Sequence, residues 1–233
     1  MIDKELLRGI SIIVPAAGRG ARMGDPARKQ YMRLNGKPML QYVLDKMLAL
    51  EARHVVVAIA ADDECFRSLA GHEDCRVVTG GASRTESVVS GLSSLRLSSD
   101  DWVMVHDGAR PCVHFDDIIR LVRTVADDEV GGILAVPVME TVKRSDDDER
   151  IAATVPREEL WLAQTPQLFR YGLLERALGE ASGSGFEATD EASAIERLGL
   201  SPMLVRGRRD NIKVTTPEDV ALAEYYLRLQ GSS

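Results

Sequence analysis

The segment from Pro15 to Tyr31 holds the residues of this chain best suited to binding and reacting an anion. It follows an apolar run, Ile10 to Val14, which predicts a buried strand that ends in a loop of small residues. Small residues let a ligand approach the backbone, so that main-chain N–H groups can bind phosphate oxygens; here they are Ala16, Ala17, Gly18 and Gly20. Three cationic side chains accompany them, Arg19, Arg22 and Lys29. The combination indicates an anionic ligand such as a nucleoside triphosphate.

Two common glycine motifs do not fit this loop. A P-loop has Gly-Lys-Ser/Thr four residues after its first glycine, and the residues after Gly18 do not follow that pattern. The dinucleotide fingerprint has glycine or alanine at its sixth position, where this chain has Met23. An ordinary strand-to-helix turn with surface arginines is the alternative interpretation. The combination of strand, small-residue loop, Arg22 and Lys29-Gln30-Tyr31 favours phosphate binding over it.

Apolar β-rich runs alternate along the chain with segments of helical periodicity, the pattern of a mostly parallel sheet flanked by helices. Strands are predicted at residues 10–15, 54–60, 76–79, 102–106 and 132–138. Helices are predicted at residues 38–50, 62–69, 84–95 and 115–126. We therefore expect a Rossmann-like, doubly wound α/β fold.

The alternation breaks between Thr141 and Pro156. Two short β-rich runs flank the acidic turn Asp146 to Glu149 and predict a protruding β-hairpin arm with a polar tip. The turn lacks the glycine and the spacing of a calcium loop, so we interpret it as solvated. Such an arm has little core of its own and requires a surface to pack on.

The rest of the chain completes one domain. It predicts helices at 171–181 and 190–198, strands at 203–205 and 212–214, and a last helix with Thr216 as N-cap and Pro217 at its first position. No linker divides the sequence. Residues 1–233 are therefore expected to form a single domain, with 141–156 as its arm.

Three chemically suitable elements follow predicted strands: the loop after Val14, the Gly80-Gly81 pair and Asp107. In open α/β sheets, ligands bind beyond the carboxyl ends of the strands. Convergence of these elements would therefore make a nucleotide pocket. His106 precedes Asp107 and is interpreted as structural.

Composition narrows the classes of partner. A net charge of −7 argues against a broad nucleic-acid or membrane surface. No segment approaches about 18 uninterrupted apolar residues, so no transmembrane helix is expected. Residues 1–5 lack the layout of a signal peptide and carry acids that a transit peptide avoids, which predicts a cytoplasmic protein.

The cysteines and histidines do not predict a metal centre. Cys65, Cys75 and Cys112 are odd in number and lack Cys-x-x-Cys spacing, so neither a disulfide framework nor a zinc site is expected. Cys112 is interpreted as a buried small hydrophobe.

Several motifs, spread over almost the whole chain, occur in the order of one known family. They are the 15–31 loop, Gly80-Gly81 with Arg84 and Ser87-Val88, His106 to Pro111, Ala163 to Gln167, Thr189 to Ser193, and Asp210 to Thr215. In these motifs the chain resembles the 2-C-methyl-D-erythritol 4-phosphate cytidylyltransferases of non-mevalonate isoprenoid biosynthesis. The resemblance implies that CMP passes from CTP to 2-C-methyl-D-erythritol 4-phosphate and that pyrophosphate leaves. It also implies Mg²⁺, held mainly by the CTP phosphates, and a homodimer in which the arm embraces the other subunit.

The resemblance assigns the nucleotide to one set of residues. CTP would be bound by Ala16, Ala17, Gly18, Gly20, Gly81, Ala82 and Ser87. The family often carries an acid at position 82, so a contact of Ala82 with the base would have to come from the backbone. The attacking phosphate is already an anion, so positioning and electrostatics carry the catalysis, with Arg22 and Lys29 as stabilisers of the transition state.

The second substrate would use another set. By resemblance, Arg157 and Lys213 position its phosphate, and its hydroxyls and phosphate contact Asp107, Arg110, Thr141 and Thr165. Because Thr141 and Arg157 flank the arm, they are expected to act in the neighbouring subunit's site. Asp107 has a second interpretation, as a ligand of the metal.

Four other functions were weighed against this one. A D-ribitol-5-phosphate cytidylyltransferase has similar loop motifs, but the segments 189–193 and 210–215 favour the methylerythritol enzyme. A sugar-1-phosphate nucleotidyltransferase fits Asp107 to Pro111 and Thr165 less well. A non-catalytic nucleotide-binding regulator should lack the cations for a second substrate, and Met23 disfavours a nicotinamide dehydrogenase.

Overall fold

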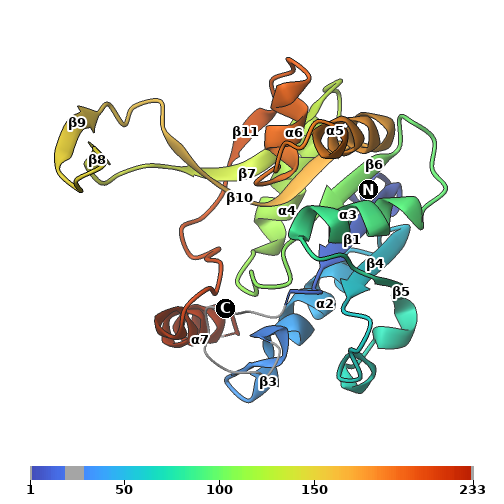
Figure 1. Cartoon of the computed structure of the whole chain (residues 1–233). Coiled ribbons are helices and arrows are strands. Elements are labelled where there is room, and N and C mark those ends of the chain that lie inside the picture. Colours follow the sequence, from blue (N-terminus) through green and yellow to red (C-terminus); the bar gives the residue numbers. More distant parts are fainter. Residues whose placement is uncertain (1, 19–28, 232–233) are drawn as a thin grey trace.

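A seven-stranded, mostly parallel sheet forms the centre of the protein (Figure 1). The structure is a computed structural model that describes residues 2–18 and 29–231. The strand order is β11-β7-β10-β6-β1-β4-β5. The strands are β1 (Ile10–Pro15), β4 (His54–Ile59), β5 (Arg76–Thr79), β6 (Trp102–Val105), β7 (Gly131–Pro137), β10 (Trp161–Arg170) and β11 (Met203–Arg206). Strand β10 is antiparallel to both its neighbours, β6 and β7, and the other pairings are parallel.

Helices cover both faces of this sheet, as the alternation predicts. On one face α2 (Met39–Ala49) and α4 (Phe115–Val125) share a core with Ile12 and Val14 of β1. On the other, α3 (Arg84–Ser93), α5 (Tyr171–Gly183) and α6 (Glu191–Arg197) share a core with Ile13. Successive side chains of a strand point to opposite faces, so a strand covered on both sides is apolar throughout. The doubly wound α/β prediction is confirmed.

Smaller elements complete the chain. They are α1 (Ile2–Arg8), the 3₁₀ turns η2 (Lys29–Tyr31), η3 (Phe66–Ser68) and η4 (His72–Asp74), and the short strands β2 (Arg33–Leu34) and β3 (Lys37–Pro38). The C-terminal helix α7 (Pro217–Gly231) packs Ala223 and Leu227 against Leu34 and Met39. Cys112 is fully buried in the same cluster, as predicted.

The predicted arm is present and extends away from the rest of the domain (Figure 1). Strands β8 (Val142–Ser145) and β9 (Ile151–Val155) form a separate two-stranded antiparallel sheet. The side chain of Ile151 is 69% exposed. The arm continues the β7–β10 pair, because Pro137 at the end of β7 pairs with Trp161 at the start of β10.

Some predicted elements were wrong. Strand β10 was not predicted, and neither was α1. The predicted helix at 62–69 is only the three-residue turn η3, and residues 212–214 do not form a strand. The backbone N–H of Val214 instead donates a hydrogen bond to Ala109 O at 2.9 Å, an ordinary length for such a bond.

Within the described residues, no helix combines the length and apolar character needed to span a bilayer.

Candidate active site

Three neighbouring hollows lie at the carboxyl ends of β1 and β6 and share Lys213. The β1 hollow has a volume of about 350 Å³ and is lined by Pro15, Ala16, Gly18, Lys29, Gln30, Met39, Gly108, Ala109, Lys213 and Thr215. The α3 hollow, of about 190 Å³, is lined by Pro15, Ala17, Gly18, Gly81, Ala82, Ser83, Arg84, Ser87, Asp107, Gly108, Ala109 and Lys213. The β10 hollow, of about 230 Å³, is lined by Arg84, Asp107, Arg110, Ala163, Gln164, Thr165, Gln167, Thr189, Asp190 and Lys213. The three elements that follow predicted strands therefore do converge.

The loop after β1 is tied to the scaffold at Ala16. The N–H of Ala16 donates to Ala58 O at 2.7 Å, and the buried Gln30 donates from Nε2 to Ala16 O at 2.8 Å. Tyr31 adds a hydrogen bond from its hydroxyl to Asp63 at 2.9 Å. Because both backbone groups of Ala16 are bonded to the protein, N–H groups for a phosphate must come from later residues of the loop. The motif Lys29-Gln30-Tyr31 thus places one cation at the β1 hollow and uses its other two side chains as supports.

At the α3 hollow, the backbone of Gly80 and Gly81 is packed closely against neighbouring side chains. A Cβ on Gly80 would lie 2.5 Å from Ala17 Cβ, and a Cβ on Gly81 would lie 2.2 Å from Glu86 Cβ, so both positions require glycine. The N–H of Gly81 donates to Ser87 Oγ at 3.2 Å, and the N–H of Ala82 donates to Glu86 Oε2 at 2.8 Å. A base contact from the backbone of Ala82 would therefore use its carbonyl or displace Glu86.

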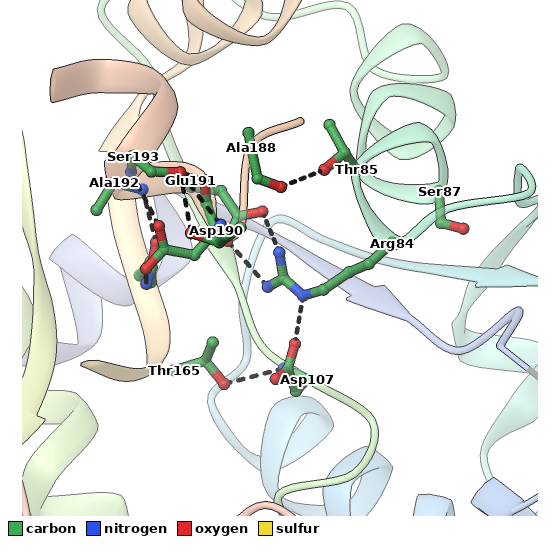
Figure 2. A network of polar contacts seen from close by, with 12 residues as sticks. Arg84, Thr85, Ser87, Asp107, Thr165, Ala188, Asp190, Glu191, Ala192 and Ser193 are labelled. Carbon is green, nitrogen blue, oxygen red and sulfur yellow. Dashed lines mark hydrogen bonds and ion pairs between the residues drawn. The ribbon is translucent and has the colours of Figure 1, made fainter. Parts of the chain in front are cut away.

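A carboxylate surrounded by three cations lies where the α3 and β10 hollows meet. Asp107 accepts a hydrogen bond from Arg84 Nε on Oδ1 at 2.7 Å, and its Oδ2 lies 2.9 Å from Lys213 Nζ and 3.7 Å from Arg110 Nε. Arg84 also donates from both terminal nitrogens to the two oxygens of Glu191, at 2.7 and 2.9 Å (Figure 2). We call these five residues the Asp107 cluster.

The charges of the cluster fix its protonation state. Burial raises the pKa of Asp107, but the opposite charges of Arg84, Lys213 and Arg110 outweigh burial and hold that pKa well below its ordinary value. Asp107 is therefore a carboxylate over the whole physiological range.

Lys213 owes its position to its neighbours in the chain. Asn211 is fully buried and donates from Nδ2 to Thr165 O at 2.9 Å, and Val214 is fully buried and bonded to Ala109 O. These anchors hold an extended segment across the site without a strand partner. Lys213 itself is 40% exposed, so its ammonium group reaches into the hollows from solvent.

Thr165 and His106 form a buried hydrogen-bonded chain behind Asp107. The N–H of Asp107 donates to Thr165 Oγ1 at 3.0 Å, Thr165 Oγ1 lies 3.1 Å from His106 Nδ1, and His106 Nε2 lies 3.1 Å from Arg110 O. Since a carbonyl can only accept, this network assigns the proton to Nε2 and lets the Thr165 hydroxyl donate to Nδ1. Burial lowers the pKa of His106 to about 4, so the ring is neutral, and the structural interpretation of His106 is confirmed.

Not all predicted site residues meet in one chain. Within residues 2–18 and 29–231, Thr141 and Arg157 do not line any of the three hollows. Both are exposed at the base of the arm, where a terminal nitrogen of Arg157 donates to Met139 O. Gly20 and Arg22 lie outside the described residues.

The side chains at the site do not resemble a protein-built metal centre. Among the described residues there is no group of three or more His, Cys, Asp or Glu side chains with metal-binding geometry. Both oxygens of Asp107 face cations, which is the wrong surrounding for a ligand of Mg²⁺. This geometry disfavours the interpretation of Asp107 as a metal ligand.

Sequence reasoning named Arg84 and Glu191 only as parts of motifs and gave neither a role. Nothing local in the sequence pairs them, because they are 107 positions apart. Gln164 and Gln167 were missed in the same way. Gln164 donates to Arg208 O at 2.8 Å, and Gln167 donates to Asp190 at 2.8 Å and accepts from the N–H of Ala192 at 2.9 Å.

The chain is similar to known proteins over most of its length. Residues 10–229 match the model of the family described as IspD, 2-C-methyl-D-erythritol 4-phosphate cytidylyltransferase. A protein of that name from Chromobacterium violaceum is 50% identical over 218 residues, covering 92% of this chain and 96% of the relative. One from Vibrio atlanticus is 47% identical over 225 residues, covering 95% and 96%.

Solved structures are similar over the same length. The crystal structure of the Francisella tularensis 2-C-methyl-D-erythritol 4-phosphate cytidylyltransferase superposes with a TM-score of 0.80 at 37% identity, covering 93% of this chain and 99% of that one. A 4-diphosphocytidyl-2C-methyl-D-erythritol synthase superposes with a TM-score of 0.81 at 36% identity, covering 94% and 98%.

Proposed function

Because the chain belongs to the 2-C-methyl-D-erythritol 4-phosphate cytidylyltransferase family, we propose that the three hollows around Lys213 hold the two substrates of that reaction. The enzyme is a nucleotidyltransferase that transfers CMP from CTP to 2-C-methyl-D-erythritol 4-phosphate. The single observation that carries the placement of substrates is the position of Lys213, which lines all three hollows.

CTP is assigned to the β1 and α3 hollows. Ala17, Gly18, Gly81, Ala82 and Ser87 line the α3 hollow, which supports a base and ribose there, while Lys29 lines the β1 hollow and suits the triphosphate. Gly20 and Arg22, from the same loop, complete this proposed site by resemblance.

The second substrate is assigned to the β10 hollow. Asp107 and Thr165 offer acceptors for hydroxyl groups, and Arg110 and Lys213 offer positive charge for a phosphate. Because Asp107 holds Lys213 at 2.9 Å in this structure, an arriving phosphate dianion competes with a carboxylate for the same ammonium group.

The chemistry needs charge stabilisation more than proton transfer. An oxygen of the methylerythritol phosphate attacks the α-phosphorus of CTP, a new P–O bond forms, and the bond to the pyrophosphate oxygen breaks. The nucleophile is already an anion, so no side chain has to remove a proton. Lys213 and Arg157 hold it near the α-phosphate, and Lys29 and Arg22 stabilise the charge that develops on the transferred and leaving groups.

Mg²⁺ is proposed as a metal that arrives with the triphosphate. The lining of the β1 hollow, proposed for the triphosphate, has lysines and small residues and no carboxylate among the described residues, which fits a cation held mainly by phosphate oxygens. When bound, it would neutralise phosphate charge and polarise the phosphoryl oxygens.

A homodimer is proposed because Thr141 and Arg157 sit on an arm that has no core of its own. The exposed Ile151 gives that arm an apolar surface to place against a second copy of the chain. In such a dimer each arm would bring Thr141 and Arg157 to the neighbour's β10 hollow. The cytoplasmic location, the single domain and the absence of nucleic-acid and membrane partners stay predictions from the sequence.

Pyrophosphate release tests the proposed function directly. The purified chain is incubated with CTP and Mg²⁺ and either 2-C-methyl-D-erythritol 4-phosphate or D-ribitol 5-phosphate. Turnover with the first alone is expected. Turnover with ribitol 5-phosphate would keep the fold and the roles of Arg22 and Lys29 but change the acceptor. CTP binding without turnover of either would favour the regulator.

A further inference from the structure

Arg84 connects two carboxylates that come from distant parts of the fold. It begins α3, and its guanidinium group bonds Asp107 after β6 through Nε and Glu191 of α6 through both terminal nitrogens (Figure 2). Every nitrogen of this group therefore donates to a carboxylate. A planar guanidinium is suited to such bridging because its donors point in fixed directions, which an ammonium group cannot reproduce.

Glu191 is itself held rigidly. It is the first residue of α6, 1% exposed at its side chain, and it follows Asp190, which caps the helix in a reciprocal pair with Ser193. Gln167 of β10 fixes the same turn through Asp190 and the N–H of Ala192. The helix start therefore gives Arg84 a fixed point of attachment outside the substrate hollows.

A buried ion pair of this kind is poorly explained by stability alone. The cost of removing two charges from water offsets most of their attraction, and apolar residues of similar size often stabilise a fold as well or better. The side chains of Glu191 and Asp107 are 1% and 7% exposed, so both are largely removed from solvent. A role in positioning another side chain would explain why these buried residues are charged.

The two oxygens of Asp107 show what is positioned. Oδ1 bonds Arg84, which is anchored to Glu191, while Oδ2 faces Lys213 and Arg110 in the β10 hollow. Arg110 Nε is buried and has no hydrogen-bond partner among the described residues, although Oδ2 is only 3.7 Å away. A carboxylate free to turn could close that gap, and the bond from Arg84 to Oδ1 opposes the turn.

From this geometry we propose that Arg84 and Glu191 are a positioning pair, which fixes Asp107 so that Oδ2 stays directed into the hollow as an acceptor for a hydroxyl of the second substrate. Without the pair, Asp107 turns toward Arg110 while still paired with Lys213, and so withdraws both cations from the substrate's phosphate. The proposal rests on the assignment of the second substrate to the β10 hollow.

The first test compares two variants with a matched control in steady-state kinetics. Arg84→Lys keeps a positive charge but cannot bond both carboxylates, and Glu191→Gln keeps Arg84 but weakens its attachment. Each should lower kcat/KM for the second substrate by about 10- to 100-fold, the loss expected for a charge-assisted hydrogen bond, while KM for CTP changes less than about threefold.

Thr85→Val is the matched control. Thr85 lies next to Arg84 on α3 and donates from Oγ1 to Ala188 O at 3.1 Å, so it links the same two parts of the fold without touching Asp107. If Arg84 only tethered α3 to the segment before α6, Thr85→Val would reduce kcat/KM for the second substrate as much as Arg84→Lys does. That result, or wild-type kinetics in Arg84→Lys, would overturn the proposal.

The pH profile of Arg84→Gln reports the charge that Arg84 places beside Asp107. The charged groups that face Asp107 are Arg84 from α3, Arg110 from the segment after β6 and Lys213 from the segment before α7; Glu191 lies behind Arg84, and the adjacent His106 is neutral. Removal of one of these three positive charges lets the pKa of Asp107 rise toward its ordinary range. In Arg84→Gln, a limb of kcat/KM that reports Asp107 should therefore lie at higher pH than in the wild type.

Thr85→Val removes no charge and should leave the pH profile unchanged. If Arg84→Gln does not fold, the kinetics of Arg84→Lys and Glu191→Gln carry the test, with thermal melting as the check of folding. All variants are assayed with whichever acceptor the wild-type chain turns over. A wild type that prefers ribitol 5-phosphate would therefore refute the proposed acceptor without deciding the role of Arg84.

Discussion

The Asp107 cluster and the β8–β9 arm place their predicted site residues in opposite ways. In the cluster, two carboxylates and three cations from four separate segments meet within one chain. At the base of the arm, Thr141 and Arg157 lie exposed beside a two-stranded ribbon that extends away from the central sheet (Figure 1). One region is organised before any ligand or partner arrives. In the proposed dimer, the other offers its residues to a second copy of the chain, so its contribution would depend on assembly.

Among substitutions that compare the Asp107 cluster with the arm, we expect the largest loss of activity at Lys213. Lys213→Ala should lower kcat/KM for the second substrate by about 10²–10³, because it removes a cation from both the nucleophile and the developing charge. Lys143→Ala on the arm is the matched control, since its ammonium bonds only Thr154 at 2.7 Å among the contacts described. Steady-state kinetics of the two variants check this. Comparable losses in both would contradict the comparison.

Complementation between variants tests whether the arm works across a subunit boundary. Arg157→Ala alone should lower turnover by roughly 10², as for the loss of one well-placed donor. Mixing Arg157→Ala with Lys213→Ala chains gives dimers in which one site has both residues if Arg157 acts in its neighbour. With random pairing, about a quarter of wild-type turnover should return. Recovery that stays at the level of the separate variants would place Arg157 in its own subunit's site.

The buried hydrogen bonds of Thr165 and His106 behind Asp107 predict that acid lowers the free energy of unfolding. His106 is neutral in the folded protein with a pKa near 4, below its unfolded value of about 6.5, so the unfolded state binds more protons between these values. The stability that depends on neutral His106 is complete above about pH 6.5 and is lost as the pH falls toward 4, by on the order of 2–3 kcal/mol.

The variant His106→Gln cannot titrate in this range. Its difference from wild type in free energy of unfolding, measured by denaturant titration, should therefore change by that amount between pH 6.5 and 4. A difference that is constant with pH would show that His106 does not titrate as its burial requires.

The smallest effect is expected on the arm itself. Ile151→Ser at an exposed position should change the free energy of unfolding of the single chain by no more than about 0.5 kcal/mol. The same substitution at Ile133, which is 4% exposed in β7, should cost roughly 2–5 kcal/mol. Urea titrations at several protein concentrations check both. A large loss at Ile151 that fades on dilution would mean that a second copy covers this side chain.

The sequence predicted the layers well because they depend on local pattern. Apolar runs such as Ile10 to Val14 and the amphipathic α4 carry the sheet and its covering helices in their own residues. Strand β10 was missed because its middle, Gln164 to Gln167, reads as polar and contains a proline. Those glutamines are buried only because α6 and the 208–211 segment supply their hydrogen bonds.

The site residues that directly follow strands could be predicted from the sequence, and those that depend on long-range pairing could not. Position after a strand identified the 15–18 loop, Gly81 and Asp107, and all of them line the α3 hollow. The same reasoning gave Arg84 no role and took residues 212–214 as a strand. Arg84 depends on Glu191, and the segment around Lys213 depends on Asn211 and Val214 finding partners elsewhere. Such long-range pairings leave no periodicity in the sequence.

The antiparallel strand β10 has one more consequence. With β7 it forms a ribbon that carries the arm at one end and Thr165 at the irregularity between Ala163 and Gln167. Between the arm and Thr165 the pairing includes the bond from Val138 N–H to Leu160 O at 2.9 Å. In a dimer joined through the arm, occupancy of the hollow and affinity between subunits would act on the same two strands. Thermodynamic linkage then requires reciprocity: whatever factor the acceptor substrate adds to subunit association, association adds to the binding of that substrate.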